Sequence, residues 1–342
     1  MADRILCFGE LLLRLGAPGR ELLLQSPRLD VQVGGAEANV AVSLARFGHH
    51  AAMAGTLTDN ALGQAALGEL RRHGVDTSRM QATPGRMGLY FLATGAGLRP
   101  SEVLYDRAGS AFAIAPADGY DWPALLAGTA WLHLSGVTPA LGPATARAAN
   151  EAVQAATAAG IQVSFDGNFR PKLWAAWDGD PATILRPLLA NASIAFADHR
   201  DIDVVLGPAG DGDDATPHAQ RFAAAAARAF AAFPRLQRIA CTVRRQDSVD
   251  HHALGALMAT RTGELVQVED RAIPGIVDRI GGGDAFAAGV LHGLIQHWSD
   301  DDSLRFGHAA ACLKHAVPGD FNLVGSDDVM ALVEGGRLDV KR

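Results

Sequence analysis

The stretch DRIGGGDAF at positions 278–286 is the part of the sequence from which the fold and the chemistry are best inferred. Its glycines, Gly281, Gly282 and Gly283, leave backbone N–H groups free to converge on an anion just before a predicted helix, whose N-terminus is the positive end of the helix dipole. Such amides stabilise the charge on a phosphoryl group during its transfer. Asp284 is then placed to act as a general base for an attacking hydroxyl. The competing interpretation is an Asp that caps the helix after a flexible turn.

A second glycine motif, GGAEANVA at positions 34–41, lies where a predicted strand becomes a helix. Gly34 and Gly35 permit a close approach of the backbone to a polar ligand, and Asn39 offers both a donor and an acceptor. A plain strand-to-helix turn would explain the motif equally well. The chain has no G-x-x-x-x-G-K-[ST] sequence and no G-x-G-x-x-G after its first strand, which disfavours two common nucleotide-binding classes.

Outward from these motifs, strand-like and helix-like segments alternate, which predicts an α/β sheet with helices on both faces. The first strand is predicted over 5–15, and another over 238–243. Two strand-like runs, 87–93 and 102–107, follow one another without a helix between them, and they predict a hairpin set apart from the main sheet. The segment 281–284 is predicted as a turn with a helix after it.

The composition and net charge of the chain disfavour some classes of binding partner. Of the 342 residues, 49% are hydrophobic and 20% are charged, as in ordinary globular proteins. The net charge of −7 provides no bulk positive field for a nucleic acid or an anionic membrane surface. The three cysteines are far apart and fit neither a disulfide framework nor a zinc site, so we expect a reducing, cytoplasmic location. No apolar run approaches the roughly 18 residues that a membrane-spanning helix needs.

Four polar side chains on or beside extended segments add a candidate anion site. Tyr90, Tyr105 and Arg107 lie in the predicted hairpin, and Arg170 follows a strand predicted over 161–166. Two arginines can clamp a carboxylate through paired hydrogen bonds. Solvated surface arginines are the competing interpretation. The histidines show no metal-ligand spacing, so no metal ligands are assigned.

These features resemble the PfkB-type, ribokinase-like carbohydrate kinases, which combine a Gly-Gly-x-x-x-Asn helix start with a Gly-x-Gly-Asp helix start near the C-terminus. Within that family the chain is most similar to the 2-keto-3-deoxygluconate kinases, through RMGLYF at 86–91, RPSEVLYDRAGSAF at 99–112 and ACLKHAVPGDFNL at 311–323. The resemblance implies a three-layer αβα core with a mostly parallel sheet and a small β-sheet lid. It implies one domain over 1–342, whose lid is formed by segments at about 11–35 and 86–112.

The resemblance also implies an activity, which is ATP-dependent phosphorylation of the 6-hydroxyl of 2-keto-3-deoxygluconate with Mg²⁺ at the phosphates. It implies a homodimer that forms through the lid, and it leaves dependence on a monovalent cation open. A fructokinase-like enzyme acting on a neutral ketose is the alternative, and it differs in whether Arg107 and Arg170 face a carboxylate. A nucleoside kinase is a more distant alternative. A sugar-acid-binding homologue without turnover is the alternative from another class.

The resemblance assigns site residues by position. Asp284 is the catalytic base, and the anion hole is formed by the amides of Gly281, Gly282 and Gly283. Substrate binding is assigned to Gly34, Gly35, Asn39, Tyr90, Tyr105, Arg107, Arg170, Asp284 and Asp320. ATP binding is assigned to Asn168, Asp198, Thr242, Arg244, Gly281 and Gly283, with Thr242 and Arg244 expected at the end of a strand.

One segment departs from the family pattern. The family has an Asn-x-x-Glu element where this chain has Asp198-His199-Arg200-Asp201. Asp198 replaces an amide with a charge, which motivates the alternative without turnover. An additional carboxylate would also suit Mg²⁺, which prefers oxygen ligands. The segment 246–254 is untypical too, so the adenine pocket is not specified.

Overall fold

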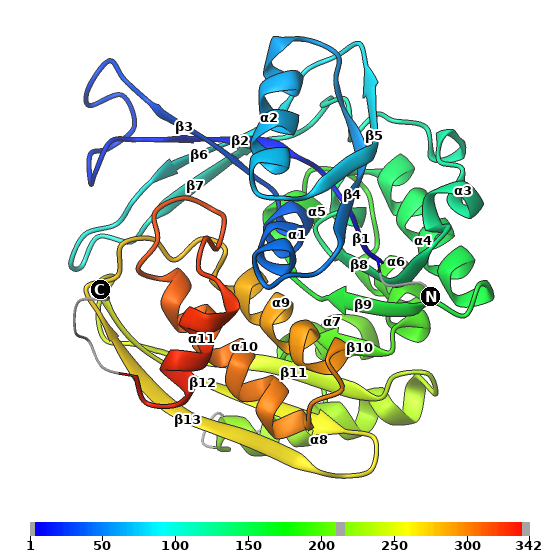
Figure 1. Cartoon of the computed structure of the whole chain (residues 1–342), viewed down its shortest axis with the longest axis vertical. Helices are drawn as coiled ribbons and strands as arrows, with labels where there is room; N and C mark the ends of the chain where they lie inside the picture. Colours follow the sequence, from blue (N-terminus) through cyan, green and yellow to red (C-terminus); the bar gives the residue numbers. More distant parts are fainter. Residues whose placement is uncertain (1–3, 210–215, 337–342) are drawn as a thin grey trace.

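The computed structural model describes residues 4–209 and 216–336, and its larger sheet forms the centre of the molecule (Figure 1). The strands of this sheet are β1 (Arg4–Phe8), β4 (Ala51–Thr58), β5 (Asp76–Thr83), β8 (Thr129–Ser135), β9 (Gln162–Asp166), β10 (Ile194–Phe196), β11 (Arg238–Gln246), β12 (His251–Thr260) and β13 (Leu265–Pro274). Their order is β13-β12-β11-β10-β9-β8-β1-β4-β5. All neighbours from β5 to β11 are parallel, and β12 and β13 are added antiparallel at one edge. Every residue of β4 is buried, as expected for a strand covered on both faces.

Helices cover both faces of the large sheet, and the buried side chains accordingly form one large cluster on each face. One cluster includes side chains of α1 (Ala36–Arg46), α2 (Ala61–Arg72), α9 (Gly282–Ile295), α10 (Asp300–Lys314) and α11 (Ser326–Val333). The other includes side chains of α3 (Trp122–Leu126), α4 (Pro143–Ala158), α6 (Pro181–Asn191), α7 (His199–Leu206) and α8 (His218–Ala232). The short helix α5 (Pro171–Trp174) follows β9. The predicted three-layer core is therefore confirmed.

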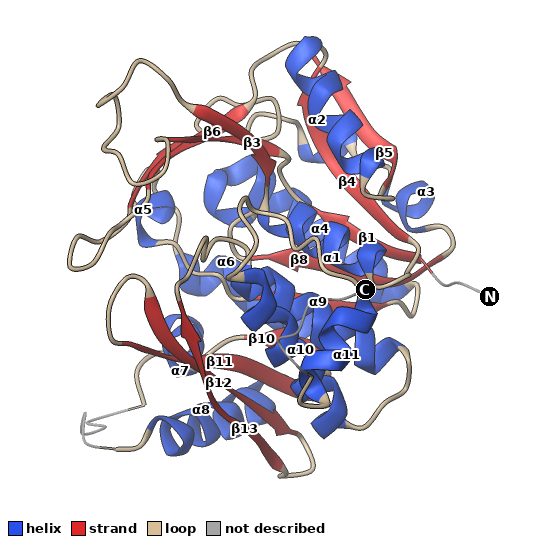
Figure 2. Cartoon of the chain, turned by 60° about the vertical axis from the view of Figure 1, so that its left-hand side comes forward, coloured by secondary structure: helices blue, strands red, loops and turns tan. Residues whose placement is uncertain are grey.

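A second sheet of four strands stands apart from the core, at the upper left of Figure 2. Its strands, in spatial order, are β3 (Asp30–Gly34), β2 (Leu12–Gly16), β6 (Gly88–Ala93) and β7 (Glu102–Asp106). Cross-strand pairing places Gln32, Arg14, Tyr90 and Tyr105 in one row on one face. The next row, on the opposite face because side chains alternate along a strand, is Val31, Leu15, Phe91 and Leu104. The predicted hairpin is thus part of a separate sheet with one polar and one apolar row.

The prediction for the first strand is wrong, and two edge strands of the large sheet lack a prediction. The strand predicted over 5–15 is divided between the two sheets, with a break at 9–11. The buried side chain of Glu10 lies at this break and pairs with Arg107, and the chain passes here from the large sheet to the small one. The edge strands β5 and β13 were not predicted, because an edge strand that is half exposed lacks the apolar pattern of a central one.

The three cysteines are free and buried. Burial, the largest cause, raises the pKa of the Cys312 thiol to about 12, so the thiol stays protonated and unreactive near neutral pH. Within residues 4–209 and 216–336, no helix is long and apolar enough to cross a membrane.

Candidate active site

A cavity of about 1220 Å³ lies at the carboxyl ends of the parallel strands, between the large sheet and the small one. Ligands of α/β proteins bind at this edge because the loops that follow the strands meet there. Asp166 lines it from the end of β9, Asp198 follows β10, and Tyr90 comes from the small sheet. All the predicted site residues except Gly34 line this cavity.

The start of α9 supplies the free amides. The helix begins at Gly282, one residue after Gly281, whose φ of 79° is in the left-handed region. A Cβ on Gly281 would lie 2.0 Å from the carbonyl oxygen of Asp320, so a larger residue does not fit. The Gly282 amide donates to Arg279 at 3.3 Å, whereas those of Gly281 and Gly283 donate to no group in the described part of the chain. Two of the three predicted anion-hole amides are therefore available.

Asp284 lies inside the first turn of α9, not in a turn before it as predicted. The helix has no side-chain cap, so the interpretation of Asp284 as a capping residue is wrong. Its carboxylate accepts a hydrogen bond of 2.6 Å from the side-chain amide of Asn39 in α1. Burial, the largest cause, raises the pKa of Asp284 to about 7 against the opposing effect of that hydrogen bond. The Oδ1 atom of Asn39 is buried without a partner among the described residues, so it is free to accept from a ligand hydroxyl.

Two further carboxylates crowd the same end of the cavity. Burial and then the charges of Asp284 and Asp201 raise the pKa of Asp166 well above its ordinary value. Burial and then the charge of Asp198 raise the pKa of Asp201 to about 6. A divalent cation would relieve the repulsion among these carboxylates, and oxygen atoms are the ligands that Mg²⁺ prefers. Asp166 and Asp201 therefore fit an Mg²⁺ ion.

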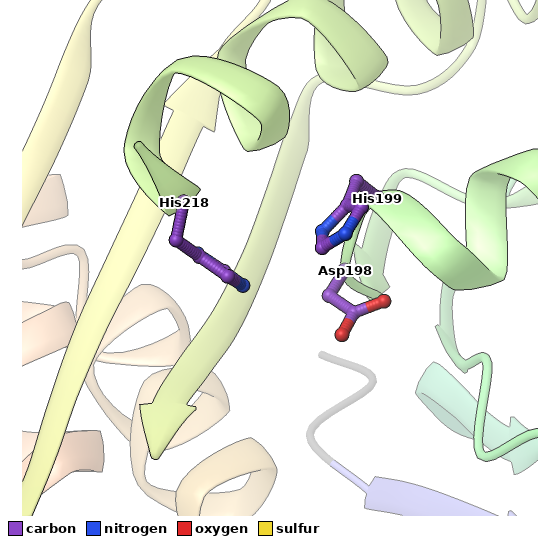
Figure 3. Close-up of side chains that lie close together, drawn as sticks. All are labelled: Asp198, His199 and His218. Carbon is purple, nitrogen blue, oxygen red and sulfur yellow. The ribbon is translucent and has the colours of Figure 1, made fainter. Parts of the chain in front are cut away.

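Asp198, His199 and His218 also offer ligand atoms, which lie within 4.8 Å of one another (Figure 3). The carboxylate of Asp198 is already engaged, because it accepts from the N–H groups of Arg200 and Asp201 and pairs with the Arg200 guanidinium. Burial acts to raise its pKa, but Arg200 keeps that pKa below the ordinary value. The N-termini of α7 and α8 add positive potential here, and imidazole nitrogen is not a preferred ligand of Mg²⁺. We place no magnesium on this cluster.

The two arginines that are predicted to bind a carboxylate differ in burial and in hydrogen-bond partners. Arg107 is buried, and its Nε donates to Glu10 at 2.6 Å while Ser110 donates to the other Glu10 oxygen. Its two terminal nitrogens donate to no described residue. Arg170 is exposed to the cavity and donates to the carbonyl of Phe169 at 3.3 Å. Glu10 thus fixes the orientation of Arg107 and leaves its outer edge free for a ligand.

The glycine pair at the start of α1 packs against protein groups. A Cβ on Gly34 would lie 2.2 Å from Oδ2 of Asp320, and one on Gly35 would lie 2.2 Å from the carbonyl oxygen of Glu10. Tyr90 donates to the same Oδ2 atom of Asp320 at 2.7 Å. The sequence predicts that a ligand approaches the backbone closely at this glycine pair. At Gly34 the side chain of Asp320 occupies that position instead.

The nucleotide side of the cavity includes Asn168, Thr242 and Arg244. Thr242 and Arg244 lie within β11 and not at its end as predicted, because pairing with β12 continues the strand past the parallel part of the sheet. Burial and then the nearby Arg279 lower the pKa of Arg244 to about 10. Arg279 also lines the cavity. Two arginines at one wall suit a phosphate-bearing ligand.

Sequence reasoning missed several residues of this region: Glu10, Arg14, Asp166, Asp201, Asp278 and Arg279. Asp166 carried a usable signal, since it ends a predicted strand in Asp-Gly-Asn. Glu10 and Arg14 carried none, because their partners lie about 100 and about 300 residues away in sequence.

A sheet edge with free helix-start amides, a partly buried carboxylate base and cavity-facing arginines defines an α/β enzyme that transfers phosphoryl groups. The chain belongs to the pfkB family of carbohydrate kinases, whose model matches residues 2–323. The predicted family is confirmed.

The similar proteins match between 85% and 100% of this chain. A Haloferax volcanii protein named 2-dehydro-3-deoxygalactonokinase is 33% identical over 342 residues, which are 100% of both chains. The Bacillus subtilis 2-dehydro-3-deoxygluconokinase is 28% identical over 295 residues, which are 85% of this chain and 82% of the relative. The crystal structure of the 2-dehydro-3-deoxygluconokinase from Thermotoga maritima has a TM-score of 0.90 and 34% identity, and the match covers 97% of this chain and 100% of that one.

Proposed function

We propose that the protein transfers the γ-phosphoryl group of ATP to the 6-hydroxyl of 2-keto-3-deoxygluconate or its galactonate-derived isomer. The observation that carries the proposal is Asp284, a carboxylate with a pKa of about 7 held by Asn39 beside the free amides of Gly281 and Gly283. A general base is most effective when its pKa is near the working pH. Relatives named for both isomers support the 2-keto-3-deoxy acids as a class more broadly than one stereoisomer.

In this mechanism the carboxylate of Asp284 takes the proton of the sugar hydroxyl as the hydroxyl oxygen bonds to the γ-phosphorus. The bond from the γ-phosphorus to the bridging oxygen breaks, and ADP leaves with that electron pair. The amides of Gly281 and Gly283 donate to the transferring phosphoryl oxygens. Asp166 and Asp201 would hold Mg²⁺, which would neutralise charge at the phosphates.

The remaining cavity residues divide into two groups in this proposal. Arg107 and Arg170 bind the substrate carboxylate, while Asn39, Tyr90, Tyr105 and Asp320, with Gly35, hold the sugar chain. Gly34 acts indirectly, because its lack of a side chain leaves the space that Asp320 fills. The free outer edge of Arg107 favours an acid over a neutral ketose, because a buried guanidinium needs a charged or polar partner. Asn168, Asp198, Thr242 and Arg244 bind the nucleotide.

We also propose a cytoplasmic homodimer formed through the small sheet. Val31 and Leu104 are 60% and 51% exposed at the two ends of the apolar row that also contains Leu15 and Phe91. An exposed apolar row of this kind is typical of a protein interface. Three free thiols agree with a reducing compartment. Light scattering on wild type and on Leu104→Glu tests the dimer, which the variant should weaken.

Release of ADP over a panel of sugar acids and neutral ketoses tests the activity. We expect turnover with 2-keto-3-deoxy acids, Mg²⁺ and ATP, and the panel is run with K⁺ and with Na⁺ to settle dependence on a monovalent cation. Faster turnover with fructose would support the neutral-ketose kinase. Binding of the acid without any ADP release would support the homologue without turnover.

A further inference from the structure

Four buried charged side chains pack against one another beside Gly281. They are Arg14, Asp278, Lys314 and Asp320, of which the most exposed, Asp278, is 8% exposed. The Cε atom of Lys314 would lie 3.3 Å from a Cβ on Gly281. Arg14 forms ion pairs with both carboxylates, whereas Lys314 donates to the carbonyl of Val317 at 2.9 Å. The loss of Arg14 therefore leaves two buried carboxylates without their ion-pair partner. Because the cluster lies beside the anion-hole glycines, a change in its charges would affect the active site.

Arg14 is the member that comes from the small sheet. One terminal nitrogen lies 2.6 Å from Oδ2 of Asp278, and the other lies 2.9 Å from Oδ1 of Asp320. Arg14 shares its row of the sheet with Tyr90, whose hydroxyl donates to the second oxygen of Asp320. The face of the small sheet that carries the proposed sugar-binding tyrosines therefore contacts two carboxylates of the core.

Both carboxylates shape the segment that presents the free amides. Asp278 accepts from the N–H groups of Ile280 and Gly319, each at 3.0 Å, and so joins the turn before α9 to the segment before Asp320. The carbonyl oxygen of Asp320 lies against Gly281 and excludes any Cβ there. A shift of Arg14 would act on both groups that determine where Gly281 lies.

We propose that Arg14 is a positioning residue that couples closure of the small sheet over the sugar to assembly of the anion hole for the nucleotide. The proposal rests on the kinase activity proposed above. The ion pairs of Arg14 with Asp278 and Asp320 hold the small sheet against the core beside the Gly281 turn. A sugar that binds the closed arrangement more tightly therefore also favours the assembled anion hole. Coupling between two binding sites is reciprocal, so the sugar must tighten nucleotide binding by the factor with which nucleotide tightens sugar binding.

Calorimetric titration with a non-hydrolysable ATP analogue, with and without the sugar that wild type phosphorylates, measures this coupling. For wild type we expect the sugar to tighten analogue binding by about 5- to 150-fold, the usual range of such coupling. For Arg14→Gln the factor should fall towards one, with a lower kcat. Arg20→Gln is the matched control, because Arg20 of the same segment pairs with core residue Asp250 at 2.6 Å on the exposed surface, and its factor should equal that of wild type.

Arg14→Lys keeps the charge but lacks the second arm, and its factor should lie between those of wild type and Arg14→Gln. It also serves as the test if Arg14→Gln does not fold. A wild-type factor near one, or a wild-type factor retained in the folded Arg14 variants with only a lower Tm, overturns the proposal. Absence of turnover with any sugar contradicts the proposed function, whereas normal turnover with an unchanged factor contradicts the coupling alone.

Discussion

At the scale of single residues, Asp284 connects the geometry of the site with its chemistry. Asp284→Asn keeps an acceptor for the side-chain amide of Asn39 but removes the base. We expect kcat to fall by about 10²–10⁴-fold, the effect of removing a positioned base, with sugar binding retained. In wild type kcat/KM should rise with pH through about 7, because only the ionised carboxylate accepts the proton. Steady-state rates between pH 5 and 9 measure both effects, and a variant with near-normal turnover would remove Asp284 from the mechanism.

The same pKa makes a prediction about stability. The folded pKa of about 7 exceeds the value of about 3.9 in an unfolded chain, so between these values the folded state binds the proton more tightly. Stability from this group is present at low pH and is lost as pH rises towards 7. Asn cannot ionise, so Asp284→Asn should have a higher Tm than wild type above pH 7 and a smaller advantage near pH 4. Thermal unfolding at several pH values checks this, and equal Tm values at pH 8 would contradict it.

The two arginines should respond differently to truncation. Arg170→Ala should raise KM for the sugar acid by roughly 10- to 150-fold, from the 1.5–3 kcal/mol of a lost charged hydrogen bond, and should raise KM for a neutral sugar less. Arg107→Ala should do the same and also destabilise the fold by about 3–5 kcal/mol, because it leaves Glu10 buried without its partner. Adding Glu10→Gln should restore part of the stability and none of the affinity. Equal KM losses on acid and neutral sugar would favour the ketose kinase.

Residues of the site could be predicted from the sequence where the signal is local. The glycines at 34–35 and 281–283 are tied to their neighbours by backbone geometry, and they indicated Asn39 and Asp284 with them. Arg14 and Glu10 could not be predicted, because an arginine or a glutamate in an apolar run is usually exposed and only the folded chain supplies its partner. The buried ion pairs are products of long-range packing.

Among the secondary-structure elements, the start of α9 leads to a further prediction. Gly281→Ala forces an alanine into a left-handed conformation with its Cβ 2.0 Å from a backbone oxygen. The conformation alone costs roughly 1–2 kcal/mol, so we expect at least that loss of stability together with a lower kcat. Gly283→Ala is the control, since nothing lies within 4 Å of its Cβ and alanine favours the helix. Denaturant unfolding of both variants should show a lower free energy of unfolding for Gly281→Ala only. Equal losses of stability in the two variants would contradict the role assigned to Gly281.

Helices and strands could be predicted from the sequence where their surroundings impose a regular apolar pattern. Central strands and amphipathic helices have strong apolar patterns, and the hairpin at 87–107 was visible because no helix separates its strands. The strand at β11 extends beyond its predicted end because β12 pairs with it antiparallel, which no local pattern of β11 records. Edge pairing is set by the partner strand.

At the scale of the whole molecule, the small sheet and the core each hold part of the site. Tyr90, Tyr105 and Arg107 come from or adjoin the small sheet, and Asp284 comes from α9 of the core. Arg14 and Tyr90 contact Asp320, and Leu13 of β2 belongs to the same buried apolar cluster as side chains of α1 and α9. The two parts therefore meet through both polar and apolar contacts. A site whose residues are divided between two parts is complete only when the parts meet, which suits a cover that closes on substrate.

Closure should therefore be visible in exchange and in turnover. Amides of Gly88–Ala93 and Glu102–Asp106 should exchange more slowly when the sugar acid is added, because the small sheet is held against the core. ATP hydrolysis without sugar should be at least about 10²-fold slower than phosphorylation, since the site excludes water and is complete only when closed. Hydrogen exchange read by mass spectrometry, with α4 residues Pro143–Ala158 as the internal control, measures the first effect. If the small-sheet amides exchange equally fast with and without sugar while turnover is normal, the small sheet is not the lid, and the roles of Tyr90, Tyr105 and Arg107 fail with it.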